Sequence, residues 1–214
     1  MFFRRIVIRR RIIHPDKTRI TFTHGQNVSV MGKQFTIVVQ DSNSTSSTAR
    51  CKDGVVKVRL AADLDGRSRN KHISLLSRRA ISRAMLPLVE EKMKQFNERH
   101  FNSELGAVRL KDNLSNWGSC SSRNNINIDF RLLFGPTEIL EAVMLHELTH
   151  TKHRNHSKAY YADLLAIMPD NKKRLRWLRD NGHRLTSEAS GTLRYTDEIK
   201  TEIETKEMPS IEGM

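Results

Sequence analysis

The stretch "AVMLHELTHTKHRNHSKAYY", residues 142–161, decides how the rest of the chain is interpreted. The apolar residues before His146, together with Leu148, predict a helix that is buried rather than solvated. On that helix His146 and His150 lie four residues apart, so both imidazoles project from one face, about 6 Å apart along the axis. Burying them without a partner would carry a large free-energy cost. The pattern therefore predicts a metal centre, and imidazole nitrogens at this spacing suit a single Zn²⁺ ion.

Glu147 follows the first histidine and completes an HExxH pattern. On a helix its carboxylate points beside the metal, where it can accept a proton from a water molecule that the metal activates. The same group can later return that proton to the leaving group. The pattern therefore predicts a zinc-dependent hydrolase in which Glu147 is the general base.

Two histidines compete for the place of third ligand, because a catalytic zinc usually has three protein ligands and one open position. His156 lies six residues after His150, beyond a turn, whereas His153 lies three residues after it on the same helix face. We prefer His156 and keep His153 as the rival. The His150–His156 spacing equals that of the metzincin signature, but His153 stands where that signature has glycine. The turn must then differ, and we expect Asn155 to take the left-handed conformation there.

Alternation and helical spacing outside this stretch predict a β-rich first part and a helical second part. An arginine-rich strand or arm is expected at residues 1–13, and a loop at 41–50. A helix over 71–100 is interrupted or kinked at Pro87. Thr137 is expected to cap the helix that carries the histidines. The other expected strands cover 18–39, 55–60, 107–112 and 126–134, and the other expected helices cover 157–168 and 171–180.

Several spaced motifs in one order resemble the YgjP-like metallopeptidase domain family, the DUF45 group allied to M48-type peptidases. The resemblance covers residues 28–185 and is most specific over 116–185. One position departs from the family pattern, since Asn116 stands before the WGSC loop where arginine is typical; Arg109, Lys111 and Arg123 are candidates to replace it. The motifs are the WGSC loop Trp117–Cys120, the strand Ile126–Leu133, the HELxH helix His146–His150, the NHS segment Asn155–Ser157 with Tyr160 and Tyr161, and the stop Pro169–Asp170.

The resemblance implies an α+β, zincin-like metallopeptidase fold, with an N-terminal β-rich part followed by a helical zinc-binding part. It implies zinc at His146, His150 and His156, with Glu147 as the catalytic residue. We expect one domain over 1–185, divided into a β-rich part (1–65) and a helical part (70–185) that holds the zinc site, followed by an acidic, disordered tail (186–214). A nucleoside-triphosphate pyrophosphohydrolase is the alternative function, since such a role has been attached to parts of the family. A third hypothesis is non-enzymatic, a basic nucleic-acid-associated module whose zinc is structural, although an open fourth zinc position argues against it.

Other residues near the motifs are candidates for substrate binding. Trp117 and Ser119 lie in the WGSC loop, Tyr160 could donate a hydrogen bond to an oxyanion, and Asp129 could accept one from a ligand histidine. Each also has a structural interpretation: a wedge or core packing for the aromatic residues and a solvated strand face for Asp129. Cys120 is interpreted as a packing residue rather than an inhibitory thiolate. The strand 126–133 is a candidate edge for an extended peptide, or an ordinary interior strand.

Charge and composition limit the possible partners. The net charge is +13, but residues 186–214 hold seven acids and three bases, so the remaining body carries +17. This body could bind polyanions without specificity, beside a peptide or protein substrate or, in the alternative, a nucleotide. The sequence shows no long apolar run, no export signal and only two cysteines, Cys51 and Cys120. We therefore expect a cytoplasmic protein that makes no membrane contact.

Overall fold

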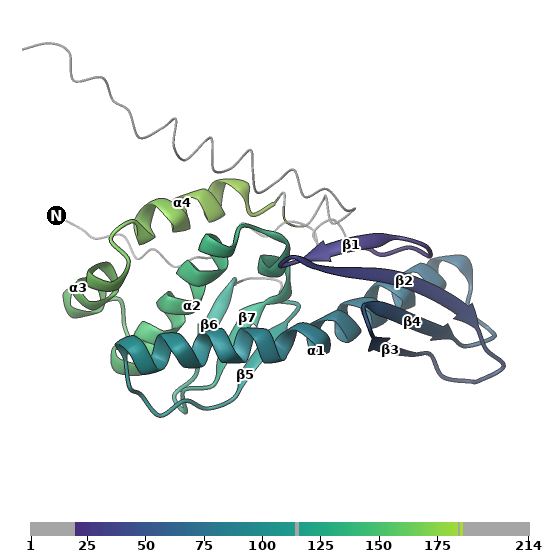
Figure 1. The fold of residues 1–214 in the computed structure, drawn as a ribbon, viewed down its shortest axis with the longest axis horizontal. Coiled ribbons are helices and arrows are strands. Elements are labelled where there is room, and N and C mark those ends of the chain that lie inside the picture. Colours follow the sequence, from purple (N-terminus) through teal and green to yellow (C-terminus); the bar gives the residue numbers. More distant parts are fainter. Residues whose placement is uncertain (1–19, 114–115, 184, 186–214) are drawn as a thin grey trace, which may run out of the picture.

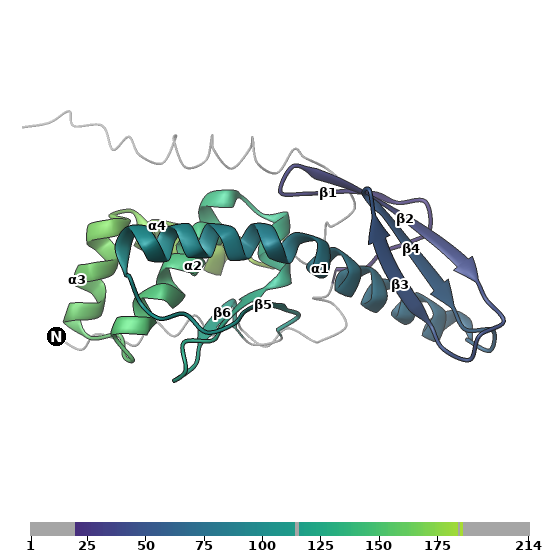
Figure 2. The same cartoon turned by 60° about the horizontal axis from the view of Figure 1, so that its bottom comes forward.

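The computed structural model describes residues 20–113, 116–183 and 185 of the 214-residue chain. It is an α+β structure in which a β-sheet precedes the helices, so the predicted fold class is confirmed. A long helix, α1 (Gly66–His100), spans the molecule (Figures 1 and 2). The first sheet packs on its amino-terminal end, and a second sheet with three helices surrounds the rest. The expected arm at 1–13 and the acidic tail at 186–214 lie outside the described residues.

The first sheet has the strand order β1-β2-β4-β3. Its strands are β1 (Asn27–Val30), β2 (Lys33–Asp41), β3 (Thr48–Lys52) and β4 (Val55–Leu60). Val56, Val58 and Leu60 point toward α1 and are fully buried, while the alternate residues of β4 face outward. The sequence analysis assigned residues 41–50 to a loop, which is wrong at its end. β3 begins at Thr48, because a two-residue turn with positive φ at Asp53 and Gly54 pairs it with β4.

α1 is a single helix of 35 residues, although Pro87 lies inside it. Asp65 caps its start by accepting a hydrogen bond from the Ser68 amide at 2.7 Å. Buried residues continue on both sides of Pro87, including Met85 and Val89, so packing holds the helix through the proline. Among the described residues, no helix is both long enough and apolar enough to cross a membrane.

The second sheet, which the sequence analysis did not foresee as a sheet, has the order β5-β7-β6. It consists of β5 (Val108–Lys111), β6 (Gly118–Cys120) and β7 (Ile126–Asp129). β7 ends at Asp129 and continues as the 3-10 helix η2 (Phe130–Phe134), so the predicted strand is shorter than expected. β7 is also the central strand. The proposal that 126–133 forms a peptide-binding edge is therefore wrong, and β6 lies at an edge instead.

Three helices complete the described chain: α2 (Thr137–Lys152), α3 (Lys158–Ile167) and α4 (Asn171–Asn181). α2 is buried on nearly all sides, with ten buried residues between Ile139 and Thr149. Its predicted cap is wrong, because Pro136 occupies the N-cap position and no side chain caps the helix. Ser157 does cap α3, accepting a hydrogen bond from the Tyr160 amide at 3.2 Å.

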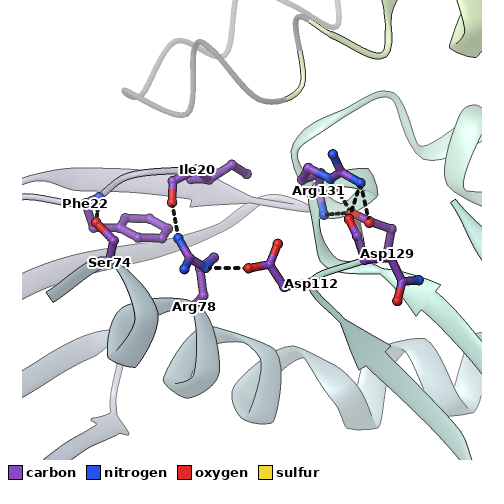
Figure 3. Close-up of polar contacts among 8 residues, drawn as sticks. Ile20, Phe22, Ser74, Arg78, Asp112, Asp129 and Arg131 are labelled. Carbon is purple, nitrogen blue, oxygen red and sulfur yellow. Dashed lines mark hydrogen bonds and ion pairs between the residues drawn. The ribbon is translucent and has the colours of Figure 1, made fainter. Parts of the chain in front are cut away.

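A buried ion pair between Arg131 and Asp129 joins the second sheet to the loops around it (Figure 3). The side chains are 1% and 0% exposed, and Arg131 Nε donates to Asp129 Oδ1 at 2.6 Å. Arg131 also donates to the Asn113 carbonyl oxygen at 2.8 Å, and its guanidinium lies 4.5 Å from the Trp117 ring centre. Burial raises the pKa of Asp129 to about 6, although its hydrogen bonds with Arg131 act in the opposite direction.

We predict that Arg131→Met destabilises the protein by about 3–5 kcal/mol, because it leaves the buried Asp129 carboxylate without its partner. Chemical denaturation measures the free energy of unfolding. Arg179→Met is the matched control, since Arg179 pairs with Asp180 at an exposed site and should change stability little. Equal losses in the two variants would contradict a structural role for the buried pair.

Candidate metal centre

Three histidine side chains converge at the carboxyl-terminal half of α2. His146 and His150 come from α2, and His156 comes from the turn before α3. One nitrogen of each ring lies within 4.8 Å of the others, and the Nε2 atoms of His146 and His156 are 3.1 Å apart. Two nitrogens bound tetrahedrally to one zinc ion would be about 3.3 Å apart, given bonds of about 2.0–2.1 Å. The three residues therefore fit a metal ion.

The turn after α2 orients His150 and separates the two rival histidines. His150 Nδ1 lies 2.9 Å from the His153 carbonyl oxygen. Only an N–H group can donate to a carbonyl oxygen, so Nδ1 carries the proton and Nε2 is available to a metal. The His153 ring lies elsewhere, with Nε2 2.7 Å from Asp163 Oδ2. The structure thus brings His156, and not His153, into the cluster.

The predicted geometry of this turn is wrong in one respect. The non-glycine residues with positive φ in the described chain are Met31, Asp53, Asn102 and Asn124, so Asn155 does not take the left-handed conformation. His153, with φ −123° and ψ 108°, is the extended residue that ends α2. An extended residue redirects the chain without a glycine-like conformation.

Burial sets the protonation states that a metal site requires. Desolvation, together with the neighbouring His150 and His156, lowers the pKa of His146 well below its ordinary value. Desolvation also lowers the pKa of His150. Both rings are therefore neutral near pH 7, which is the form that binds metals.

Tyr160 packs behind the cluster. Its ring centre lies 4.7–5.4 Å from those of all three histidines, and its hydroxyl donates to the His146 carbonyl oxygen at 3.1 Å. Burial and the nearby Glu147 carboxylate raise the pKa of this hydroxyl, so it stays protonated. The side chain is 0% exposed. Tyr160 therefore packs against and supports the ligand rings.

Glu147 lies against β6 through a contact that only glycine allows. A Cβ atom at Gly118 would lie 2.5 Å from Glu147 Oε1 and 2.8 Å from its Cγ. Glu147 itself is 5% exposed, and burial raises its pKa to about 8. A dication at the three histidines would favour the carboxylate form. Gly118 is not predictable from the sequence, because the meeting of β6 and α2 is a tertiary contact with no sequence spacing.

Arg154 is a second residue that the sequence analysis missed. It donates to the Ser121 carbonyl oxygen at 2.8 Å and to Asn124 Oδ1 at 2.7 Å, and so joins the turn after α2 to the loop after β6. Cys120, at the end of β6, lies 3.9 Å from an Arg154 nitrogen. Burial raises the pKa of Cys120, and Glu147 raises it further, which favours the thiol over a thiolate.

The remaining predicted substrate contacts divide between buried and accessible positions. Trp117 is buried between the Arg131 guanidinium and Gly182, whose added Cβ would lie 2.5 Å from the indole, so it acts as a wedge. Asp129 is fully buried and bonded to Arg131, so its described contacts are structural. Ser119 is half-buried on the edge strand β6, and its hydroxyl accepts a hydrogen bond from Asn127 at 2.9 Å.

Comparison with known protein families identifies the chain. The sequence model of the YgjP-like metallopeptidase domain matches residues 5–181, most of the chain and further toward the amino terminus than the motifs alone indicate. No curated protein and no solved structure gives a significant match. The match contains both the three histidines and the neighbouring Glu147. The chain therefore belongs to the YgjP-like metallopeptidase domain family.

Proposed function

We propose that this protein is a zinc-dependent peptidase that binds its metal through His146, His150 and His156. The observation that carries the proposal is the meeting of three imidazoles beside a buried carboxylate, Glu147, with the pKa values of His146 and His150 lowered by burial. Imidazole nitrogens suit zinc, and three protein ligands leave one position open for chemistry. A zinc ion bound there would supply Lewis acidity and lower the pKa of a water molecule in its coordination sphere.

Glu147 would act as the general base and then as the general acid in this reaction. Its carboxylate accepts a proton from the attacking water and later delivers it to the nitrogen of the leaving amine. The surrounding protein excludes bulk water from this carboxylate, since the side chain is 5% exposed. Gly118 allows the carboxylate to lie directly against β6, so the proton acceptor and the edge strand are adjacent.

The edge strand β6 is the element that would align a substrate. Within the described part of the chain, its three residues pair with β7 on one side and with no strand on the other, since the sheet order is β5-β7-β6. An extended peptide can therefore add to the other side through main-chain hydrogen bonds. Such a peptide would run beside Glu147, because Gly118 belongs to β6. This arrangement favours a polypeptide over a compact metabolite as the substrate.

The choice of His156 as third ligand predicts a difference between two alanine variants. His156→Ala should lose bound zinc, whereas His153→Ala should keep it, because His153 supports His150 through a carbonyl oxygen that the substitution retains. Metal analysis after dialysis of the purified proteins measures the zinc content. Zinc lost from His153→Ala but retained in His156→Ala would instead identify His153 as the third ligand.

The role of Glu147 predicts that Glu147→Gln keeps zinc but lowers turnover at least about a hundredfold, because an amide cannot accept the proton. Cleavage of an unbiased peptide library by the wild type and the variant measures this. Nucleoside triphosphates, assayed in parallel for pyrophosphate release, test the alternative substrate. Wild-type activity in Glu147→Gln would contradict the mechanism, whichever substrate is cleaved.

The contact at Gly118 predicts that Gly118→Ala lowers turnover at least about tenfold while zinc content is unchanged. The added methyl group must displace the Glu147 carboxylate, and a small misplacement of a catalytic group costs much of the rate. Gly66→Ala is the matched control, since no atom lies within 4 Å of the Cβ added there. Unchanged turnover in Gly118→Ala would show that Glu147 tolerates a different position.

A further inference from the structure

A cleft of about 590 Å³ lies between α1 and β5, and its lining includes none of the metal-centre residues. Its α1 side includes Arg79 and Arg83, and its β5 side includes Arg109 and Lys111. The volume falls within the range of about 300–1,000 Å³ that is typical of ligand sites. The lining of this second site comes from α1, from β5 with the following residue, and from the first residue of η2.

Four cations surround the cleft without a counter-charge. Arg79, Arg83, Arg109 and Lys111 are exposed, and no hydrogen bond or ion pair joins their side chains to any other described residue. The one acid in the lining, Asp112, lies 3.1 Å from the Arg78 guanidinium. Like charges gathered at this density repel one another, and a bound anion removes that repulsion.

Arg78 connects the two walls of the cleft, and its ion pair with Asp112 is drawn in Figure 3. Arg78, on α1, is buried; it pairs with Asp112 just beyond β5 and also donates to the Ile20 carbonyl oxygen at 2.6 Å. One guanidinium thus connects the helix, the second sheet and the segment that leads into the first sheet. The cationic walls are therefore held in place before any ligand binds, which reduces the entropy lost on binding.

We propose that this cleft binds single-stranded nucleic acid through its phosphates. Arg79 and Arg83 are one helical turn apart, about 6 Å along the axis, and the two β5 cations are about 6.7 Å apart along the strand. Successive phosphates of an extended strand can match both spacings. Three of the four cations are arginines, whose planar forks bind phosphate oxygens in pairs. The apolar floor of Leu75, Leu86 and Leu110 offers a surface to the bases.

Other polyanions fit these features less well. A polycarboxylate supplies charge but no flat apolar group for the floor, whereas a nucleic-acid strand supplies both. A duplex holds its bases stacked inside the double helix, so it too offers no flat apolar group to the leucines. An anionic membrane would attract the cations, but no apolar side chain projects from the lining to insert into it, since the leucines are half-buried and Phe130 is 1% exposed. No aromatic side chain in the lining is exposed, so we expect binding with little sequence preference.

Fluorescence anisotropy of a labelled oligothymidylate with the full chain, over a series of salt concentrations, tests the proposal. The variant Arg79→Gln/Arg83→Gln/Arg109→Gln should bind at least about tenfold more weakly. Its slope of log affinity against log salt should fall by about 2, since each phosphate contact on a single strand contributes about 0.7. Thermal melting by circular dichroism checks that the variant is folded.

The control removes the same charge elsewhere. Arg50→Gln/Lys52→Gln/Lys57→Gln alters three exposed cations on the outer face of the first sheet and should change the affinity less than about twofold. Equal losses in the two variants would overturn the proposal in favour of general attraction to the basic body. Displacement of the strand by polyglutamate, duplex DNA or phosphatidylserine vesicles at equal charge concentration would overturn it in favour of that polyanion.

This binding is independent of the proposed peptidase function. None of the cleft residues is a metal ligand, so wild-type protein stripped of metal by a chelator, and the Glu147→Gln variant, should bind the oligonucleotide as tightly as untreated protein. Loss of peptide cleavage with retained binding would leave the cleft proposal intact. Loss of binding after chelation would contradict it, because the cleft would then depend on the metal centre.

Discussion

The burial of α2 on nearly all sides is the constraint on which the rest of this structure depends. A helix in this position would ordinarily carry apolar side chains only, yet α2 holds His146 and Glu147 at 5% exposure each. Burying a carboxylate without a cation costs free energy, and the raised pKa of Glu147 reflects that cost. A dication bound by the neighbouring imidazoles would offset it. The metal centre and the hydrophobic core are therefore parts of one arrangement.

Neighbouring elements contribute to this centre through contacts that hold positions rather than take part in chemistry. Gly118 lets β6 approach Glu147, Tyr160 packs against the three histidines, and Arg154 fixes the loop after β6 to the turn after α2. Behind them, the Arg131 guanidinium lies over Trp117 and is bonded to Asp129. None of these residues touches the reacting atoms. Each restricts the motion of another side chain or loop that lies closer to the metal centre.

Local features of this chain could be predicted from sequence, and long-range ones could not. The spacing of His146 and His150 follows from helix geometry, and β4, α3 and α4 lie close to where periodicity placed them. The loop predicted over 41–50 is wrong at its end, because Thr48–Lys52 becomes a strand only by pairing with β4. The central position of β7 and the contact between Gly118 and Glu147 depend equally on partners far along the chain. Such contacts leave no periodic trace in the sequence.

The order of the second sheet also determines how the two sites of this molecule can influence each other. β5 borders the cationic cleft and β6 borders the metal centre, and they are opposite edges separated by β7. Two strand spacings amount to about 9.5 Å, which is close to the Debye length of about 8–10 Å at physiological salt. Salt screens exposed charges beyond this distance but screens a buried site such as the metal centre less, so coupling through the field should weaken as the ionic strength rises. A ligand held along β5 also leaves the free side of β6 open, so that a polypeptide could occupy one edge while a polyanion occupies the other.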